Sequence, residues 1–456
     1  MSDLAARFEA ALAPEARRIG EAIQAAGGRP LLVGGWVRDL LLGIPHSKDF
    51  DLEVFGLAPK TLRRCLTVFG PVHNVGRHFG VLKLATRHAE YDVSFPRREV
   101  KVGQGHKGFE VTPDPHMSFE EAASRRDFTI NSMGYAFLER RLLDPFGGRT
   151  DLEAGCLRHV GPAFGEDPLR VLRAMQFAGR FAFRIAPETL DICRAQDLSE
   201  LPRERMWDEF RKLLLQAPRP SEGFGYAEPL GVLPYFPELE ALWRAPAPAG
   251  CERTPWAATM AVLDQAAALR AGDPVRDLVL MLAALCHRFG LDAAAGPEGP
   301  ARRFLLRLTN EERVIAAVET LLRELEQPEA LHARRSEGGD GAVRRLALRV
   351  ALPFLRTAAL ARHRARAGPD APFAAGDWLE ERARALGVWE QPPEPLLKGR
   401  HLLGMGVRPG PAMGELLAEA FERQLDGELT TREAALDWVR RRLPASAAAL
   451  GEGGPP

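Results

Sequence analysis

The hydrophobic pattern of this chain changes period at about residue 150, and that change limits what it can fold into. Before this point, five short apolar runs alternate with turns, at residues 30–33, 50–55, 81–84, 91–95 and 133–137. Runs of this length predict strands with helices between them. After Asp151, segments with the 3.6-residue period of amphipathic helices follow one another, as in Pro168–Phe181 and Glu204–Leu215. The sequence therefore predicts an α/β head followed by a mostly α-helical remainder.

Breaks rich in glycine, proline and charge divide the helical part of the sequence. They lie at residues 245–250, 334–341 and 391–395, and residues 444–456 are small and rich in glycine and proline. We therefore expect four domains. They are a head at residues 1–150, a neck at 151–215, a body at 216–390 and a tail at 391–456, with the last dozen residues disordered.

Composition restricts the class of protein and its partners. With 456 residues, 46% of them hydrophobic, the chain is long enough to build a large core. No apolar run reaches the roughly 18 residues of a membrane span, and residues 1–26 predict an amphipathic helix rather than a signal peptide. Five cysteines without a close pair indicate reduced thiols, so we expect a cytoplasmic protein. Because the net charge is zero, any nucleic-acid site must come from local arginine patches.

Residues 31–43 predict a strand, a Gly34-Gly35 turn and a helix. Such a turn can hold a phosphate, because glycines allow close approach and the amide groups at the start of the helix point at the anion. Arg38 would add positive charge to the site. Taken alone, the motif fits an ordinary tight turn better than a phosphate site.

Two carboxylates follow this turn closely. Asp49 and Asp51 lie two residues apart in a predicted strand, so both point to one face while Phe50 points to the core. Neighbouring carboxylates repel each other unless a cation lies between them. Two Mg²⁺ ions would fit here: one would activate an attacking 3′-hydroxyl, and the other would hold a triphosphate and stabilise the leaving pyrophosphate. The alternative is a pair of solvated acids on an edge strand, which the glycine motif just upstream makes the weaker interpretation.

Four motifs in this order resemble those of the class II tRNA nucleotidyltransferases, or CCA-adding enzymes, and the bacterial poly(A) polymerases. The motifs are Gly34–Asp39 (GGWVRD), Asp49–Asp51 (DFD), Arg125–Asn131 (RRDFTIN) and Glu166–Arg170 (EDPLR). The resemblance is strong to about Leu215 and looser beyond it. It implies a head of the DNA polymerase β-like nucleotidyltransferase type, with Asp49 and Asp51 as metal ligands. Asp92 is a candidate third ligand, and a structural acid at a strand end is the alternative.

The resemblance assigns nucleotide selection to Asp167 and Arg170, which share one face of a predicted helix that continues with Arg173. Cytosine and adenine both present an amine donor beside a ring-nitrogen acceptor, whereas guanine and uracil present the reverse order. Asp167 could accept from the amine while Arg170 donates to the ring nitrogen, so that C and A would match. Without the other motifs, a helix cap at Asp167 and a local ion pair of Arg170 would be the simpler interpretation.

The resemblance also places the segment that begins with Arg125 and Arg126, and that includes Asp127 and Asn131, near the sugar and phosphates of the nucleotide. An exposed basic start of a helix is the alternative. Residues 97–118, just before this segment, are too rich in glycine and charge to predict a fixed element. In the family this is a flexible loop that is shortened in enzymes that add only CC. Its length here argues against CC-only activity but does not separate CCA addition from A-only addition.

Residues 256–290 resemble the HD phosphohydrolase domain that some of these enzymes carry, but the metal ligands do not match. Ala258 stands where a first histidine is expected, and His287-Arg288 replaces the His-Asp pair. An arginine offers a cation where a metal needs a carboxylate. We therefore expect residues 256–330 to be a helical scaffold without phosphohydrolase activity, with His287 hydrogen-bonded in the core.

Residues 399–443 resemble the tail of the same family, in which Arg440–Arg442 could contact phosphates or form a solvated helix end. The leading hypothesis is the addition of C and A from CTP and ATP to the 3′ end of tRNA, with Mg²⁺ as cofactor. A-only or poly(A) addition is the first alternative, and a non-catalytic RNA-binding relative is the second. The intact aspartates and the Asp167–Arg170 pair argue against a non-catalytic relative. One departure is Gln176, which stands where many relatives carry an arginine and could alter the nucleotide pocket or a contact in the neck.

Overall fold

The computed structural model describes residues 2–44, 49–75, 81–101, 109–289, 299–337 and 339–443. The chain forms two compact units that divide between Glu240 and Ala241. This division lies inside the segment 216–390 that the sequence predicts as one body. The disorder predicted for the last dozen residues lies outside the described part of the chain. Within the described ranges, no helix is long and apolar enough to span a bilayer.

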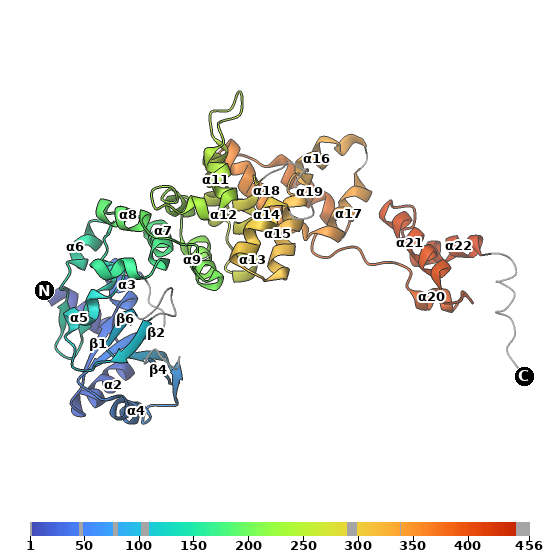
Figure 1. Ribbon diagram of the computed structural model, residues 1–456. Coiled ribbons are helices and arrows are strands. Elements are labelled where there is room, and N and C mark those ends of the chain that lie inside the picture. The colour runs from blue at the N-terminus through green and yellow to red at the C-terminus, as the bar shows by residue number, and fades with distance from the viewer. Residues whose placement is uncertain are drawn as a thin grey trace, which may run out of the picture. The chain divides into compact units, whose positions relative to one another are not determined.

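The first unit is built on a seven-stranded sheet with the strand order β3-β4-β5-β2-β1-β8-β9. Figure 1 labels the strands β1, β2 and β4 of this sheet, drawn in blue. The strands are β1 (Arg29–Val33), β2 (Asp49–Phe55), β3 (Val72–Val75), β4 (Val81–Ala85), β5 (Glu90–Ser94), β8 (Gly134–Ala136) and β9 (Arg141–Leu143). The pair β2 and β5 is parallel, and the other pairs of this sheet are antiparallel. The five strands that the apolar runs predict are confirmed. The sequence analysis missed β3 and β9, which have only four and three residues.

Alternation along β2 builds the core on one face of this sheet. Phe50, Leu52 and Val54 are buried, and the ring of Phe50 stacks on Tyr91 of β5 with 5.1 Å between the ring centroids. The other face carries acids. Asp51 is exposed, whereas Glu53, two residues further along, is fully buried. Other protein groups therefore cover the acidic face at Glu53 and leave it open at Asp51.

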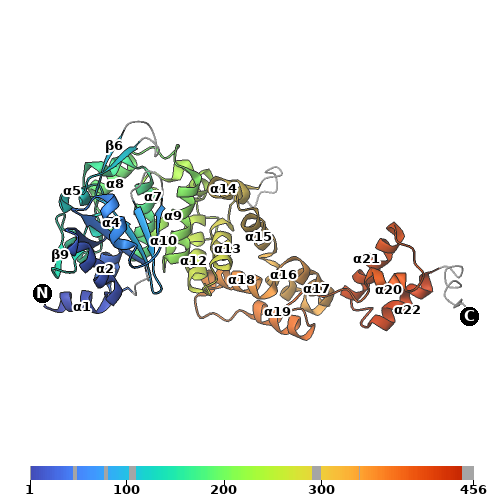
Figure 2. The same cartoon turned by 90° about the horizontal axis from the view of Figure 1, so that it is seen from below.

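The helices of the first unit surround the sheet and continue beyond it. They are α1 (Ser2–Ala11), α2 (Pro14–Ala25), α3 (Gly35–Leu42), α4 (Pro59–Leu66), α5 (Phe119–Ser124), α6 (Gly148–Glu153), α7 (Leu169–Phe181), α8 (Pro187–Arg194), α9 (Arg203–Gln216) and α10 (Pro220–Phe224). The single helix expected over residues 1–26 is wrong, because the chain breaks before Pro14 and restarts with that proline in the first turn of α2. Helices α7 and α9 confirm the two helices named from the sequence, and they pack against each other (Figure 2).

Residues 97–118 correct a second expectation. The sequence indicates no fixed element there, but β6 (Arg97–Lys101) and β7 (Phe109–Pro113) pair as an antiparallel hairpin. Backbone pairing over five residues of each strand stabilises the hairpin, although the segment as a whole is rich in glycine and charge. The part of the expected flexible loop at residues 102–108 lies outside the described residues.

The second unit is helical throughout its described residues, as the period of the sequence predicts. After α11 (Pro237–Arg244), which spans the division, it contains α12 (Pro255–Ala268), α13 (Pro274–Cys286), α14 (Pro300–Leu308), α15 (Glu312–Glu324), α16 (Gln327–Ala333), α17 (Asp340–Arg349), α18 (Leu352–Ala367), α19 (Ala374–Ala385), α20 (Gly399–Leu403), α21 (Pro411–Leu425) and α22 (Arg432–Arg442). Many of these helices begin at a proline, whose fixed φ suits the first turn.

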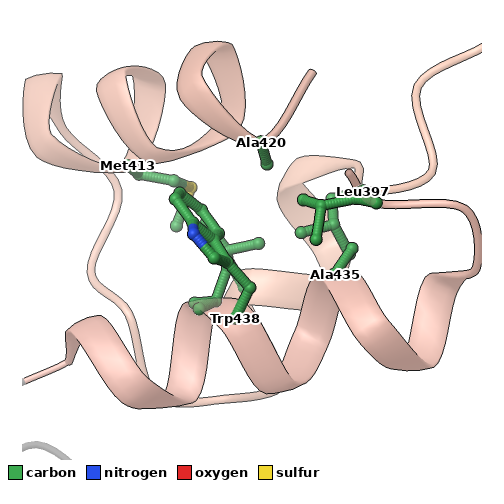
Figure 3. Close-up of a cluster of buried hydrophobic side chains, with 8 residues drawn as sticks. Leu397, Met413, Ala420, Ala435 and Trp438 are labelled. Carbon is green, nitrogen blue, oxygen red and sulfur yellow. The ribbon is translucent and has the colours of Figure 1, made fainter. Parts of the chain in front are cut away.

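The tail helices α20, α21 and α22 enclose a small hydrophobic core of their own (Figure 3). Figure 3 shows Trp438 of α22 beside Met413 of α21, and Leu397 beside Ala435 of α22. Ala420 of α21 belongs to the same buried cluster. The basic end of α22 is in part neutralised. Arg440 pairs with Asp437 at 2.6 Å, and Arg442 pairs with Glu419.

Candidate nucleotide-binding site

A polar cavity of about 480 Å³ lies in the first unit. It is lined by Gly34, Gly35, Arg38, Asp51, Arg97, Arg125, Arg126, Asp127, Asn131, Asp167, Leu169, Arg170, Arg173 and Arg205. The structure thus brings together residues that the sequence singles out in four separate motifs. Three of the lining residues were not predicted: Arg97, Leu169 and Arg205. The side chain of Asp49 lies outside the described residues, and Asp92 is not among the lining residues.

The glycine turn follows the predicted path from β1 into α3. Gly34 has φ +69°, a left-handed conformation that favours glycine. A Cβ atom at Gly34 would lie 3.1 Å from Nη1 of Arg126, and one at Gly35 would lie 3.2 Å from Nη2 of Arg38. The left-handed backbone favours glycine at position 34, and at both positions a side chain would press on the end of an arginine.

Arg38 is buried inside the site rather than extended into it. Its Nη1 donates to Oδ1 of Asn131 at 2.6 Å, and its Nε donates to Oδ1 of Asp39 at 2.8 Å. Its guanidinium also lies over the rings of Phe177 and Phe181, 5.2 and 4.8 Å from their centroids. Burial lowers the pKa of Arg38, while the neighbouring Asp39 opposes that change. The positive charge of Arg38, which the sequence suggested for a phosphate, is thus partly balanced by Asp39. Arg38 also fixes the side chain of Asn131.

Carboxylates gather on the open part of the acidic face. Asp51 of β2 and Asp92 of β5 are direct partners in the parallel register, so both side chains lie on the same face of the sheet. Both residues are exposed. Position 49 precedes Asp51 by two residues on the same strand. The register therefore places Asp92 directly beside Asp51 on this face of the sheet.

Glu53 is a functional candidate that the sequence analysis missed. Its Oε1 accepts a hydrogen bond from Nη2 of Arg125 at 3.2 Å, and its Oε2 accepts one from Nη2 of Arg126 at 3.1 Å. One buried carboxylate therefore receives both arginines of the third motif. The signal was present in the sequence, because Glu53 continues the two-residue spacing of Asp49 and Asp51.

Asp127 organises a polar cluster in the wall of the cavity. Its Oδ1 accepts from the amide of Phe128 at 2.8 Å and from Nδ2 of Asn131 at 3.0 Å. Its Oδ2 accepts from Nε of Arg173 at 2.7 Å. Burial alone would raise the pKa of Asp127, but the charge of Arg173 and these hydrogen bonds outweigh it and lower the pKa to about 2. Asp127 is therefore ionised at neutral pH and pairs with the partly exposed Arg173.

The two residues assigned to base selection have other partners in this structure. Both oxygens of Asp167 accept from Arg205 of α9, and its Oδ1 also accepts from the amide of Leu169 at 3.1 Å. Arg170 donates from Nη1 to the carbonyl of Ala163 at 2.7 Å and from Nη2 to the carbonyl of Arg125 at 2.6 Å. Asp167 thus accepts from the first amide group of α7, although the residue at the N-cap position is Pro168. An ion pair of Arg170 with an acid is not among the described contacts.

Gln176 lies on α7 but does not line the cavity. It is buried, and its Nε2 has no hydrogen-bond partner among the described residues. The departure noted at this position therefore lies outside the residues that line the cavity.

The HD-like region of the second unit keeps a single histidine from the expected ligand set. His287 lies at the end of α13, and its Nδ1 is 2.8 Å from the carbonyl of Ala284. Burial lowers the pKa of His287 to about 4, so the ring is neutral at pH 7. The hydrogen bond agrees with the predicted structural role. In the described residues of this unit, no group of three or more His, Cys, Asp or Glu side chains could hold a metal ion.

Comparison with known proteins identifies the family. Residues 31–158 match the family described as the poly A polymerase head domain, and residues 182–242 match the probable RNA and SrmB- binding site of polymerase A. A multifunctional CCA protein of Methylococcus capsulatus is 36% identical over 424 residues, which cover 86% of this chain and 93% of that protein.

Two solved structures resemble the chain over almost its whole length. The Bacillus stearothermophilus CCA-adding enzyme in complex with CTP is 25% identical, with a TM-score of 0.69 over 94% of this chain and 98% of that chain. The Thermotoga maritima CCA-adding enzyme complexed with tRNA_CCA shares the fold at 19% identity, with a TM-score of 0.61 over 97% and 98% of the two chains. Together with the cavity and its four motifs, these matches show that the chain belongs to the family of multifunctional CCA proteins, which are tRNA nucleotidyltransferases.

Proposed function

We propose that this chain adds C and A nucleotides from CTP and ATP to the 3′ end of tRNA and so builds the CCA end. The observation that carries the proposal is one cavity, in a member of this family, that is lined both by Asp51 and by the Asp167–Arg170 pair. Structural relatives in complex with CTP and with tRNA_CCA support the substrates.

The acids of β2 and β5 support a site for divalent cations at one wall of the cavity. Asp51 and Asp92 are register partners on one face, and both are exposed. Carboxylate oxygens are the ligands that Mg²⁺ prefers in proteins. Asp49 and Asp51, with Asp92 as a third ligand, would hold Mg²⁺. The bound ions would activate the 3′-hydroxyl and stabilise the leaving pyrophosphate.

The glycine turn and the two arginines beside it support a binding place for the triphosphate. The start of α3 offers backbone amide groups, and Arg125 and Arg126 reach the same cavity from the end of α5. Because Glu53 neutralises one of these two positive charges, a net positive charge remains to attract the phosphates. In the reaction, the 3′-oxygen of tRNA forms a bond to the α-phosphorus while the bond from that phosphorus to the pyrophosphate breaks.

Base selection requires Asp167 and Arg170 to offer hydrogen bonds to the incoming base. Asp167 can accept from the base amine while it keeps Arg205, because each carboxylate oxygen has two acceptor positions. Arg170 has five N–H donors and uses two of its terminal groups on backbone carbonyls, so other donors remain for the ring nitrogen. The surrounding residues would thus fix the orientation of the Asp167 and Arg170 side chains before the nucleotide binds.

The products made on tRNA that lacks its 3′ end test the proposal. The full-length chain is incubated with Mg²⁺ and each triphosphate alone, and then with CTP and ATP together, and the product ends are sequenced. We expect two C residues followed by one A when both nucleotides are present. Products that carry A alone would support A-only addition, a long run of A would support poly(A) addition, and the absence of any product would contradict catalysis.

A further inference from the structure

Glu53 is a buried acid beside the cavity that the chemistry above does not need. Its side chain is fully shielded from solvent, although it lies only two residues beyond the exposed Asp51 on β2. An ionised carboxylate is costly to bury unless partners satisfy both of its oxygens. A negative charge near a triphosphate site also opposes substrate binding. The position of Glu53 therefore calls for a local explanation.

The partners of Glu53 explain why it is buried, because their hydrogen bonds connect the end of α5 to β2. Arg125 is the residue that follows α5, and Arg126 comes next. Both side chains reach back to the same carboxylate, one to each oxygen, at 3.2 and 3.1 Å. Arg126 also lies beside Gly34, where a Cβ atom would be 3.1 Å from its Nη1. A single acid thus fixes both arginines at the rim of the phosphate turn.

The backbone of Arg125 extends this connection to the base-selecting motif. Its carbonyl oxygen accepts a hydrogen bond of 2.6 Å from Nη2 of Arg170. The second anchor of Arg170 is the carbonyl of Ala163, at 2.7 Å from Nη1. The orientation of the Arg170 guanidinium therefore depends on where the backbone of Arg125 is held. Glu53 holds the side chain of that same residue.

We propose that Glu53 is a positioning residue for nucleotide selection and acts through Arg125 on Arg170. Strand β2 fixes Glu53, the carboxylate fixes Arg125, and the carbonyl of Arg125 orients the guanidinium of Arg170. The same strand carries Asp51. Strand β2 would therefore position both the reacting phosphate, through Asp51, and the guanidinium of Arg170 that contacts the base. The inference deepens the proposed function and rests on the role of Arg170 in it.

The first test replaces Glu53 by glutamine in the full-length chain. The kcat and KM are measured for CTP, ATP, UTP and GTP on tRNA that lacks its 3′ end. We expect the preference for CTP over UTP, as a ratio of kcat/KM values, to fall about tenfold, because a charge-assisted hydrogen bond contributes at least that factor. The matched control is Glu324→Gln in the second unit. Glu324 is equally buried and pairs with Arg349 through both oxygens, so its loss tests charge removal alone.

A double-mutant cycle separates the relay from a general loss of structure. Arg170→Ala should lower the same preference, and Glu53→Gln in the Arg170→Ala background should lower it no further, since Glu53 acts through Arg170. Effects that multiply in the double variant would overturn the proposal. So would a Glu53→Gln variant that slows all four nucleotides by one factor and keeps their ranking.

Two further outcomes distinguish this inference from the proposed function. If the wild type adds neither C nor A, the proposed function fails and the relay fails with it. If the wild type adds both but Arg170→Ala keeps the ranking, the proposed function stands and the relay is overturned. Should Glu53→Gln not fold, Arg125→Met removes the same link while Glu53 keeps Arg126. This variant is expected to lose the preference for CTP, and an unchanged preference would contradict the relay.

Discussion

The guanidinium of Arg205 donates to both carboxylate oxygens of Asp167, from Nη1 to Oδ1 at 3.2 Å and from Nη2 to Oδ2 at 2.8 Å. One turn further along α9, Glu209 pairs with Arg173 of α7 at 3.5 Å. Residues four apart on a helix share one face. Arg205 and Glu209 of α9 therefore pair with Asp167 and Arg173, which have the opposite charges. Helix α9 thus fixes the carboxylate that is proposed to accept from the base amine.

Replacing Arg205 by methionine keeps the length of the side chain but removes the bidentate contact. Asp167 then loses its fixed orientation. We expect the KM for both CTP and ATP to rise about tenfold, because that factor corresponds to the loss of one charge-assisted hydrogen bond. The control is Arg211→Met on the same helix, whose partner Asp208 is exposed. Steady-state kinetics with each nucleotide decide the matter, and an unchanged KM for both nucleotides would show that Asp167 does not need Arg205.

Replacing Asp51 by asparagine should lower turnover by several orders of magnitude, because a metal-binding charge is lost at the reacting phosphate. The same result is expected for Asp49→Asn. Asp51 is exposed, so the melting temperature of its variant should remain that of the wild type. Incorporation by both variants at near wild-type rates in Mg²⁺ would refute the catalytic assignment.

Asp127 should make part of the stability dependent on pH. Its pKa falls from 3.8 to about 2 on folding, so the charged form contributes stability above about pH 4 that is lost as the pH falls toward 2. A shift of this size corresponds to about 2 kcal/mol. We expect the difference in melting temperature between the wild type and Asp127→Asn to narrow as the pH is lowered from 4 toward 2. A difference that stays constant over this range would contradict the ion pair with Arg173.

The HD-like region is predicted to have no hydrolytic activity. The Nδ1–H of His287 donates to the backbone carbonyl of Ala284, and the side chain has no carboxylate partner among the described contacts. Replacing it by alanine should leave nucleotide addition unchanged. Hydrolysis of 2′,3′-cyclic phosphates and phosphomonoesters should be at background for both proteins. Metal-dependent hydrolysis by the wild type that is lost in the variant would show that this region is an active site.

The sequence was sufficient for those parts of the fold and site that depend on short-range pattern. Alternation predicted β2 and the shared face of its acids, and the turn from β1 into α3 followed from two adjacent glycines. Register was not predictable in the same way. Asp92 became a strong candidate only when the parallel pairing of β2 with β5 placed it beside Asp51.

Contacts between residues far apart in the chain could not be predicted from the sequence. Arg205 is 38 positions from Asp167, and nothing local to either residue indicates that α9 packs across α7. Glu53 accepts hydrogen bonds from Arg125 and Arg126, which lie 72 and 73 positions away, so nothing in its own strand indicates these partners. The hairpin of β6 and β7 was missed for the same reason, because its strands are stabilised by each other rather than by a hydrophobic pattern.

Arg170 offers the most direct test of how the chain selects a nucleotide. Its donors face a ring acceptor in C and A, whereas U and G place a ring N–H at that position, so donor would face donor. Changing Arg170 to alanine removes an attraction and a repulsion together. We therefore expect incorporation of C and A to fall and discrimination against U and G to relax.

The measurement is single-nucleotide incorporation from all four triphosphates on tRNA that lacks its 3′ end, with a melting curve of the same Arg170→Ala protein beside it. The account predicts that the preference for C and A over U and G shrinks by about 5- to 150-fold, the range expected for one matched base contact. An unchanged ranking of the four nucleotides together with a lowered melting temperature would contradict it, because Arg170 would then serve only to join the carbonyls of Ala163 and Arg125.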